Sequence, residues 1–208
     1  MLTARAALDA LREGNRRFVS DLSHDAGSSS TRRRVLPEVQ EPIAIILGCS
    51  DARVPAEIVF DQGLGDLFVI RVAGNIVAPS QVGSVEFAAE TFGTRLVVVL
   101  GHSSCGAIHA TVEQLLHPSR AQSRNVSSIV DRIRPAVEGL LERRPQPERG
   151  VLEQQAVRAN IRMSADHLRH GSAVLEQLIH KDGLMVVGAE YSLETGVVDF
   201  FDGVPGSA

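Results

Sequence analysis

The chain has 208 residues, of which 44% are hydrophobic and 22% are charged. This composition is typical of one globular domain and excludes a disordered, collagen-like or coiled-coil chain. The formal net charge of -4 gives no general attraction to nucleic acid, and no apolar run is long enough to span a membrane. The N-terminus carries charges every few residues and lacks the apolar segment of a signal peptide, so we expect a cytoplasmic protein with neither kind of partner.

The N-terminal part predicts a helix followed by an exposed arm. Residues 3–20 place apolar side chains at helical spacing, with Thr3 as a typical N-cap. Residues 21–34 are polar and include three consecutive arginines, so they lack the apolar content of a core. We therefore expect a single domain over 1–208, in which 1–41 form a helix and arm and 42–208 form the core.

The rest of the chain alternates between two kinds of segment. Apolar, β-branched runs that predict buried strands cover residues 43–48, 67–74, 96–102 and 185–193, with a short fifth run at 196–201. Segments that predict helices lie at 55–61, 80–93, 105–117, 126–144 and 151–181. Strands that alternate with helices in this way predict an α/β fold: a mostly parallel β-sheet flanked by helices, with an N-terminal helical arm.

Two predicted strands end in chemically reactive residues. The first is followed by Cys49, Asp51 and Arg53 in the string GCSDAR, and the third by His102 and Cys105 in GHSSCG. If these strands are neighbours, their ends open into one crevice, where two thiolates and an imidazole form a zinc ligand set with a free fourth position. Each residue alone has a simpler interpretation, as a small buried cysteine or a hydrogen-bonded core histidine. A closed structural zinc site, with Asp51 as the fourth ligand, is the main alternative.

These motifs resemble those of the β-class carbonic anhydrases. The strings CSDARV, FVIRVAGNIV and GHSSCG occur in the order found in that family. The resemblance implies that Cys49, His102 and Cys105 bind one zinc ion per chain. It also implies that Asp51 and Arg53 form the family's dyad, in which the aspartate either ligates the metal or pairs with the arginine and leaves a water on the metal.

The resemblance also implies a substrate pocket. The residues of this chain at the positions that line the pocket in the family are Gln40, Phe68, Phe87 and Gly106. Phe87 stands where many members have tyrosine, and Ile46 stands where some have tryptophan. Those two residues and an arginine, here Arg71, form an inhibitory bicarbonate site in some members. We therefore expect that site to be absent or weak here, and Arg71 to be a structural or interface residue.

The function implied by the resemblance is the zinc-dependent reversible hydration of carbon dioxide to bicarbonate and a proton. Two alternatives remain: the same chemistry on carbonyl sulfide or carbon disulfide, and a non-catalytic interaction module stabilised by zinc. Arg53 argues against the module, because a structural carboxylate ligand needs no competing guanidinium. The resemblance further implies a homodimer or homotetramer, in which the N-terminal helix and arm wrap a neighbour.

Overall fold

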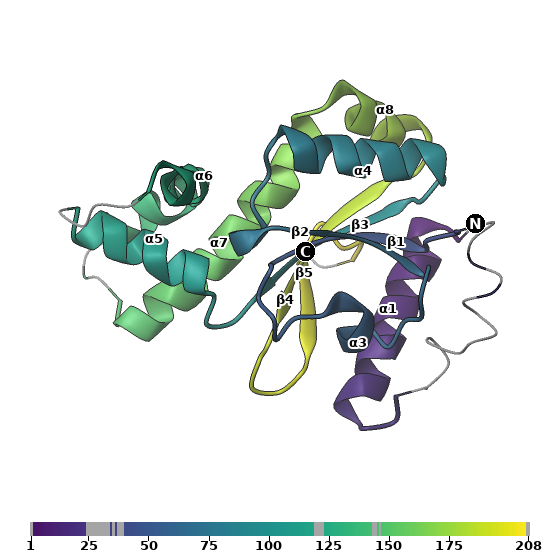
Figure 1. Ribbon diagram of the computed structural model, residues 1–208, viewed down its shortest axis with the longest axis horizontal. Coiled ribbons are helices and arrows are strands. Elements are labelled where there is room, and N and C mark those ends of the chain that lie inside the picture. Colours follow the sequence, from purple (N-terminus) through teal and green to yellow (C-terminus); the bar gives the residue numbers. More distant parts are fainter. Residues whose placement is uncertain are drawn as a thin grey trace.

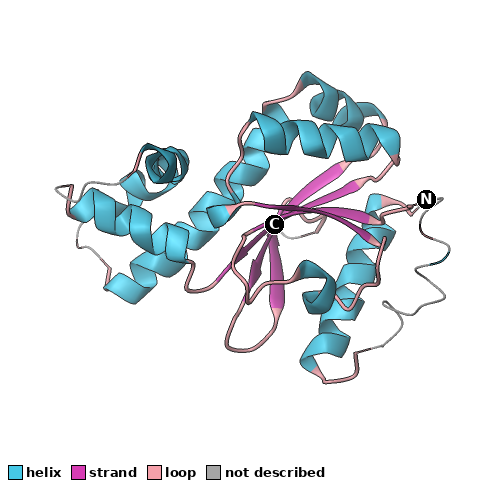
Figure 2. Cartoon of the chain, viewed as in Figure 1, coloured by secondary structure: helices cyan, strands magenta, loops and turns pink. Residues whose placement is uncertain are grey.

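The computed structural model describes residues 2–23, 34, 36, 40–118, 123–142, 145 and 147–206. These residues form a five-stranded sheet in the order β2-β1-β3-β4-β5 (Figures 1 and 2). Its strands are β1 (Ala44–Gly48), β2 (Leu67–Arg71), β3 (Leu96–His102), β4 (Met185–Tyr191) and β5 (Val198–Asp202). All neighbouring pairs are parallel except β4 with β5. The predicted fold class, a mostly parallel sheet in an α/β protein, is confirmed.

The helices form one layer on each face of this sheet (Figure 1). On one face lie α1 (Ala4–Val19) and α3 (Ala56–Val59), and on the other lie α4 (Pro79–Thr91), α7 (Arg149–His170) and α8 (Ala173–Lys181). The helices α5 (Gly106–Leu116) and α6 (Arg124–Leu141) pack on α7 and on each other. In the described part of the chain, no helix is both long and apolar enough to cross a membrane.

Burial on both sides explains the continuous apolar run in the inner strand β1. Ile45 and Leu47 belong to the core under α4 and α7, whereas Ala44 and Ile46 belong to the core under α1. Successive side chains of a strand point to opposite faces, so a strand covered on both faces needs apolar residues at every position.

The N-terminal helix packs on its own chain. The Thr3 hydroxyl caps it by accepting a hydrogen bond from a first-turn N–H at 3.2 Å, as predicted. Leu8 is fully buried against the sheet, and Asn15 is buried further along the same helix. The apolar side of this helix is therefore covered by its own chain, and the wrapping of a neighbour by the helix stays a prediction. Most of the predicted arm, residues 21–34, lies outside the described residues.

The predicted helix over 151–181 is divided into α7 and α8. The break lies at Gly171, where an added Cβ would approach the carbonyl oxygen of His167 to 2.5 Å. The next residue, Ser172, starts α8, because its hydroxyl accepts a hydrogen bond from the N–H of Leu175 at 3.2 Å. A helical side-chain pattern continues across this point, so periodicity alone does not reveal the break.

Candidate metal centre

The three predicted zinc ligands meet at one end of the sheet. Strand β1 pairs directly with β3, so the residues that follow both strands share one edge. Cys49 follows β1, His102 ends β3, and Cys105 immediately precedes α5. Their two sulfur atoms and a ring nitrogen all lie within 4.8 Å of one another. All three residues are buried, with exposed fractions of 5%, 0% and 4% respectively.

His102 has the orientation and tautomer of a metal ligand. Its Nδ1 lies 2.9 Å from the carbonyl oxygen of Ser103. Because a carbonyl only accepts, Nδ1 carries the hydrogen and Nε2 keeps a free lone pair. Nε2 is buried and has no hydrogen-bond partner among the described residues. An unpartnered buried nitrogen beside two thiols fits a metal ion, since buried polar atoms are otherwise paired.

The surroundings of Cys49 favour the thiolate that zinc requires, whereas the hydrogen bond to Cys49 and burial raise the pKa of the Cys105 thiol. The N–H of Gly74 donates to Cys49 Sγ at 3.3 Å, and the N–H groups of Ala107 and Ile108 at the start of α5 face the Cys105 sulfur. The Cys105 thiol donates to Cys49 and lowers the pKa of the Cys49 thiol, although burial acts in the opposite direction. Hydrogen bonds to the charged form stabilise that form. The donor set therefore fits a zinc ion.

Asp51 is held beside this cluster by Arg53. The guanidinium donates from Nε to Oδ1 at 2.9 Å and from Nη2 to Oδ2 at 2.8 Å, and the backbone N–H of Arg53 donates to Oδ1 at 3.0 Å. These bonds hold the pKa of the Asp51 carboxyl well below its usual range. Oδ2 lies 3.8 Å from Nε2 of His102. The carboxylate thus lies next to the cluster while it is paired with the arginine.

Arg71, which we expected to be a structural or interface residue, holds the loop that carries Cys49 and Asp51. Its Nε donates to the Cys49 carbonyl at 3.0 Å, and its Nη2 donates to the Asp51 carbonyl at 2.6 Å. The parallel register places Arg71 opposite Gly48, directly beside this loop. Ile46 is fully buried in the core. The weak bicarbonate site stays a prediction.

Comparisons with known proteins match this site to one family. The sequence model of the carbonic anhydrase family matches residues 44–198. "Carbonic anhydrase 2" of Mycobacterium tuberculosis is 38% identical over 192 residues, which is 92% of this chain and 89% of that protein. This chain belongs to the carbonic anhydrase family. It is a zinc-dependent enzyme that interconverts carbon dioxide and bicarbonate.

Solved structures of β-class carbonic anhydrases share the fold. One from Aspergillus fumigatus has a TM-score of 0.74 at 22% identity, covering 96% of this chain and 91% of that chain. A structure described as a tetrameric β-carbonic anhydrase of Sordaria macrospora has a TM-score of 0.69 at 19% identity, covering 94% of this chain and 95% of that chain. These likenesses show that the chain has the fold of these two proteins.

Two of the substrate residues expected in this carbonic anhydrase lie on the surface. Gly106 adjoins Cys105 as the first residue of α5, and it is exposed at the cluster end of the sheet. Gln40 is exposed in the segment that leads into β1, and therefore lies near the opposite end of that strand from Cys49. Only Gly106 is thus next to the cluster of its own chain.

The two expected aromatic residues form a separate group. Phe68 pairs with Ile45 in the neighbouring strand, four residues before Cys49, which is about 13 Å along a strand. Phe68, Phe87 and Phe92 contact one another, with ring centroids between 5.6 and 6.3 Å apart. We call these three residues the aromatic face. Phe87 is 53% exposed, so the aromatic face opens to the outside of the chain rather than onto the metal centre.

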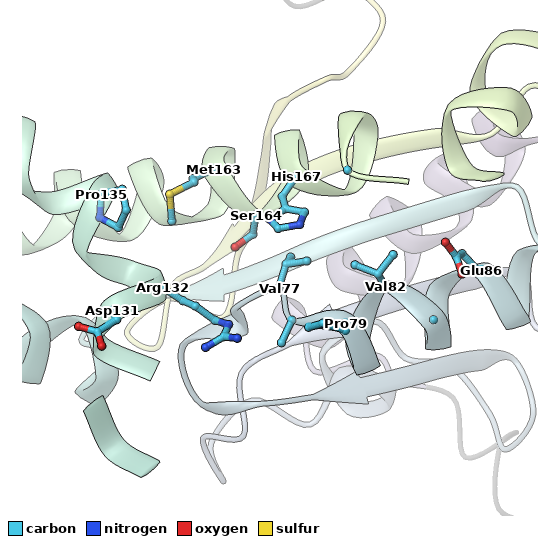
Figure 3. Close-up of a pocket in the computed structure, with 13 residues that line it drawn as sticks. Val77, Pro79, Val82, Glu86, Asp131, Arg132, Pro135, Met163, Ser164 and His167 are labelled. Carbon is cyan, nitrogen blue, oxygen red and sulfur yellow. The ribbon is translucent and has the colours of Figure 1, made fainter. Parts of the chain in front are cut away.

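Two pockets lie close to the helices beside the metal centre. One of about 660 Å³ lies between α4, α6 and α7, with Arg132 and His167 directed into it (Figure 3). None of the cluster residues lines it. A second pocket of about 460 Å³ has Cys105 in its wall together with charged residues such as Glu153 and Arg158. Neither pocket includes the expected substrate residues Gln40, Phe68, Phe87 and Gly106.

Proposed function

We propose that Cys49, His102 and Cys105 hold the catalytic zinc of this carbonic anhydrase. The observation that carries the proposal is the buried, unpartnered Nε2 of His102 in a cluster whose ligand atoms lie within 4.8 Å of one another. When bound by three protein ligands, zinc lowers the pKa of a water in its fourth position to about 7 and so supplies hydroxide at neutral pH. The described residues contain one such cluster, which supports one zinc ion per chain.

We propose that Asp51 and Arg53 control the fourth position of the zinc site, which the three ligands leave open. A carboxylate without its proton only accepts hydrogen bonds, so Asp51 takes a hydrogen bond from the attacking water and directs its lone pair toward carbon dioxide. The two-point contact with Arg53 keeps Asp51 ionised and fixes its orientation. Release from Arg53 would free Asp51 to become a fourth ligand, so the dyad also opens and closes the site.

We further propose that the substrate pocket is completed across an interface between two copies of the chain. Gly106 lies beside Cys105, whereas Gln40, Phe68 and Phe87 lie away from the cluster of their own chain. An apolar wall for carbon dioxide therefore needs the aromatic face of a second copy. The exposure of Phe87 and the open edge of strand β2 support a homodimer or homotetramer. The Sordaria macrospora relatives with this fold are described as tetrameric.

Two further proposals concern the whole chain. Cys49 and Cys105 form no disulfide, and a reducing compartment preserves cysteines that act as zinc ligands, which supports a cytoplasmic protein. Strands from residue 44 to residue 202 share one sheet, which supports a single domain over 1–208 with residues 1–41 as its N-terminal extension.

Stopped-flow measurement of carbon dioxide hydration by the zinc-loaded protein tests the function directly. Carbonyl sulfide and carbon disulfide serve as parallel substrates in the same experiment. We expect hydration of carbon dioxide well above the rate of metal-free protein, and little turnover of the two sulfur compounds. Preferential turnover of a sulfur compound would reassign the substrate. A zinc-loaded protein without any of these activities would favour the non-catalytic module.

A further inference from the structure

We propose that Asn160 is a positioning residue for the metal centre, which it affects through Gly74 and Cys49. This inference rests on the proposed function, because it assigns Cys49 as a zinc ligand. Asn160 lies on α7, far along the chain from Gly74 and Cys49. Among the described residues, it makes no hydrogen bond to Cys49, His102 or Cys105. It acts instead on the short turn η1 (Ala73–Asn75), which follows strand β2.

Asn160 is an amide in an apolar environment. Only 1% of its surface is exposed, and its neighbours Val157 and Ile161 belong to the hydrophobic core. Its Nδ2 donates to the carbonyl oxygen of Gly74 at 2.8 Å. Its Oδ1 is buried and has no hydrogen-bond partner among the described residues. An amide that satisfies only half of its hydrogen-bonding capacity contributes little net stability. Its clearest effect is therefore to fix the Gly74 peptide.

Gly74 connects this hydrogen bond to the metal centre. Its carbonyl accepts from Asn160, while its own N–H donates to Cys49 Sγ at 3.3 Å. Its φ of +69° belongs to the left-handed region, which glycine adopts without strain. An added Cβ would lie 2.8 Å from Ile133 of α6 and 3.0 Å from Ala107 of α5. The turn is thus packed against two helices and tied to a third.

This geometry lets Asn160 hold the Gly74 N–H in place on the Cys49 sulfur. A thiolate is stabilised by an N–H that points at it, and the strength of that bond depends on the direction of the donor. Without Asn160, the Gly74 carbonyl loses the bond that fixes the turn, and the N–H on the other side of the same Cα can rotate away from Cys49. Partners that orient metal ligands in this way affect metal affinity as well as activity.

The test compares two buried asparagines. Asn160→Leu removes the donor at similar volume, and Asn160→Ala serves if the leucine variant does not fold. Asn15→Leu is the control, because Asn15 is also buried and donates to two backbone carbonyls, at Val59 and Gly196, but on the opposite face of the sheet. For each protein we would measure zinc affinity by competition with a chelator, the thiolate-to-metal absorption of the cobalt-substituted form, and thermal stability.

We expect both Asn160 variants to bind zinc about 10-fold to 100-fold more weakly than wild type. Their cobalt-substituted forms should show a shifted thiolate absorption band. Asn15→Leu should lose stability but keep the wild-type affinity and band. The proposal is overturned if the Asn160 variants match wild type in both measurements, or if Asn15→Leu weakens zinc binding equally. Absence of a thiolate band from wild-type cobalt protein would instead reject Cys49 and Cys105 as ligands.

Discussion

The metal centre and the aromatic face are built in opposite ways. At the metal centre every ligand is buried, and each is fixed by backbone groups of its own chain, as Gly74 fixes Cys49 and Ser103 fixes His102. The aromatic face is a surface, where Phe87 is half exposed and packs on the rings of Phe68 and Phe92. A single chain can therefore assemble the metal ligands, whereas it leaves the expected substrate wall open.

The largest effect is expected from the ligands themselves. Cys49→Ala, His102→Ala and Cys105→Ala each remove one of three zinc ligands, so each variant should lose its zinc and all measurable hydration. Metal analysis after dialysis gives the zinc content. X-ray absorption of the wild-type protein should show two sulfur ligands at about 2.3 Å. Full zinc content in all three variants would contradict the assignment of these residues as zinc ligands. The single chain would then not assemble a metal site at this end of the sheet.

The dyad is expected to separate zinc binding from catalysis. Arg53→Ala releases Asp51, which can then occupy the fourth position, and Asp51→Ala removes the acceptor that orients the attacking water. Both variants keep the three ligands, so both should retain zinc while hydration falls by roughly 100-fold, the effect of losing a positioned proton acceptor. Parallel zinc analysis and stopped-flow rates check this. Loss of zinc from either variant would show that the dyad is structural.

The aromatic face should respond to a charge as an interface does. Phe87→Asp places a carboxylate in the aromatic group, so we expect association to weaken by about 30-fold, equivalent to about 2 kcal/mol, with a parallel loss of hydration. Ile58→Asp is the matched control, because Ile58 is 60% exposed but lies on α3, on the opposite face of the sheet. Sedimentation and hydration rates should change only for Phe87→Asp. If Phe87→Asp assembles like wild type and keeps full activity, the aromatic face of a second copy does not complete the substrate pocket.

Sequence reasoning succeeds where the information is local and fails where it depends on register or packing. Cys49, His102 and Cys105 follow buried apolar runs in recognisable strings, and the parallel pairing of those runs brings them together as predicted. Arg71 reaches the Cys49 loop only because β2 pairs with β1 in one particular register. Asn160 meets Gly74 across 86 residues of sequence, through the way α7 packs. No local pattern encodes either contact.

The smallest expected effect concerns the charge of Asp51. Arg53 holds the pKa of this carboxyl below its ordinary value of about 3.9. A group whose pKa is depressed by folding stabilises the protein above its unfolded-state pKa, and this stabilisation is lost as the pH falls through the folded-state pKa. Because the pair is partly exposed, the contribution is at most about 1 kcal/mol. Urea unfolding of metal-free wild type and Asp51→Asn should therefore differ by no more than this at neutral pH, and the difference should shrink in acid.

The depressed pKa of Asp51 also determines how the pH dependence of hydration activity is interpreted. Asp51 stays ionised throughout the range from about pH 6 to about pH 9, so it contributes no inflection there. The rise of kcat/KM with pH, through a midpoint above about 7, then belongs to the water activated by zinc. Asp51→Asn should lower the rate at every pH and leave this midpoint in place, measured by initial hydration rates with buffer in excess. A midpoint that disappears in Asp51→Asn would contradict the assignment of this midpoint to the water activated by zinc.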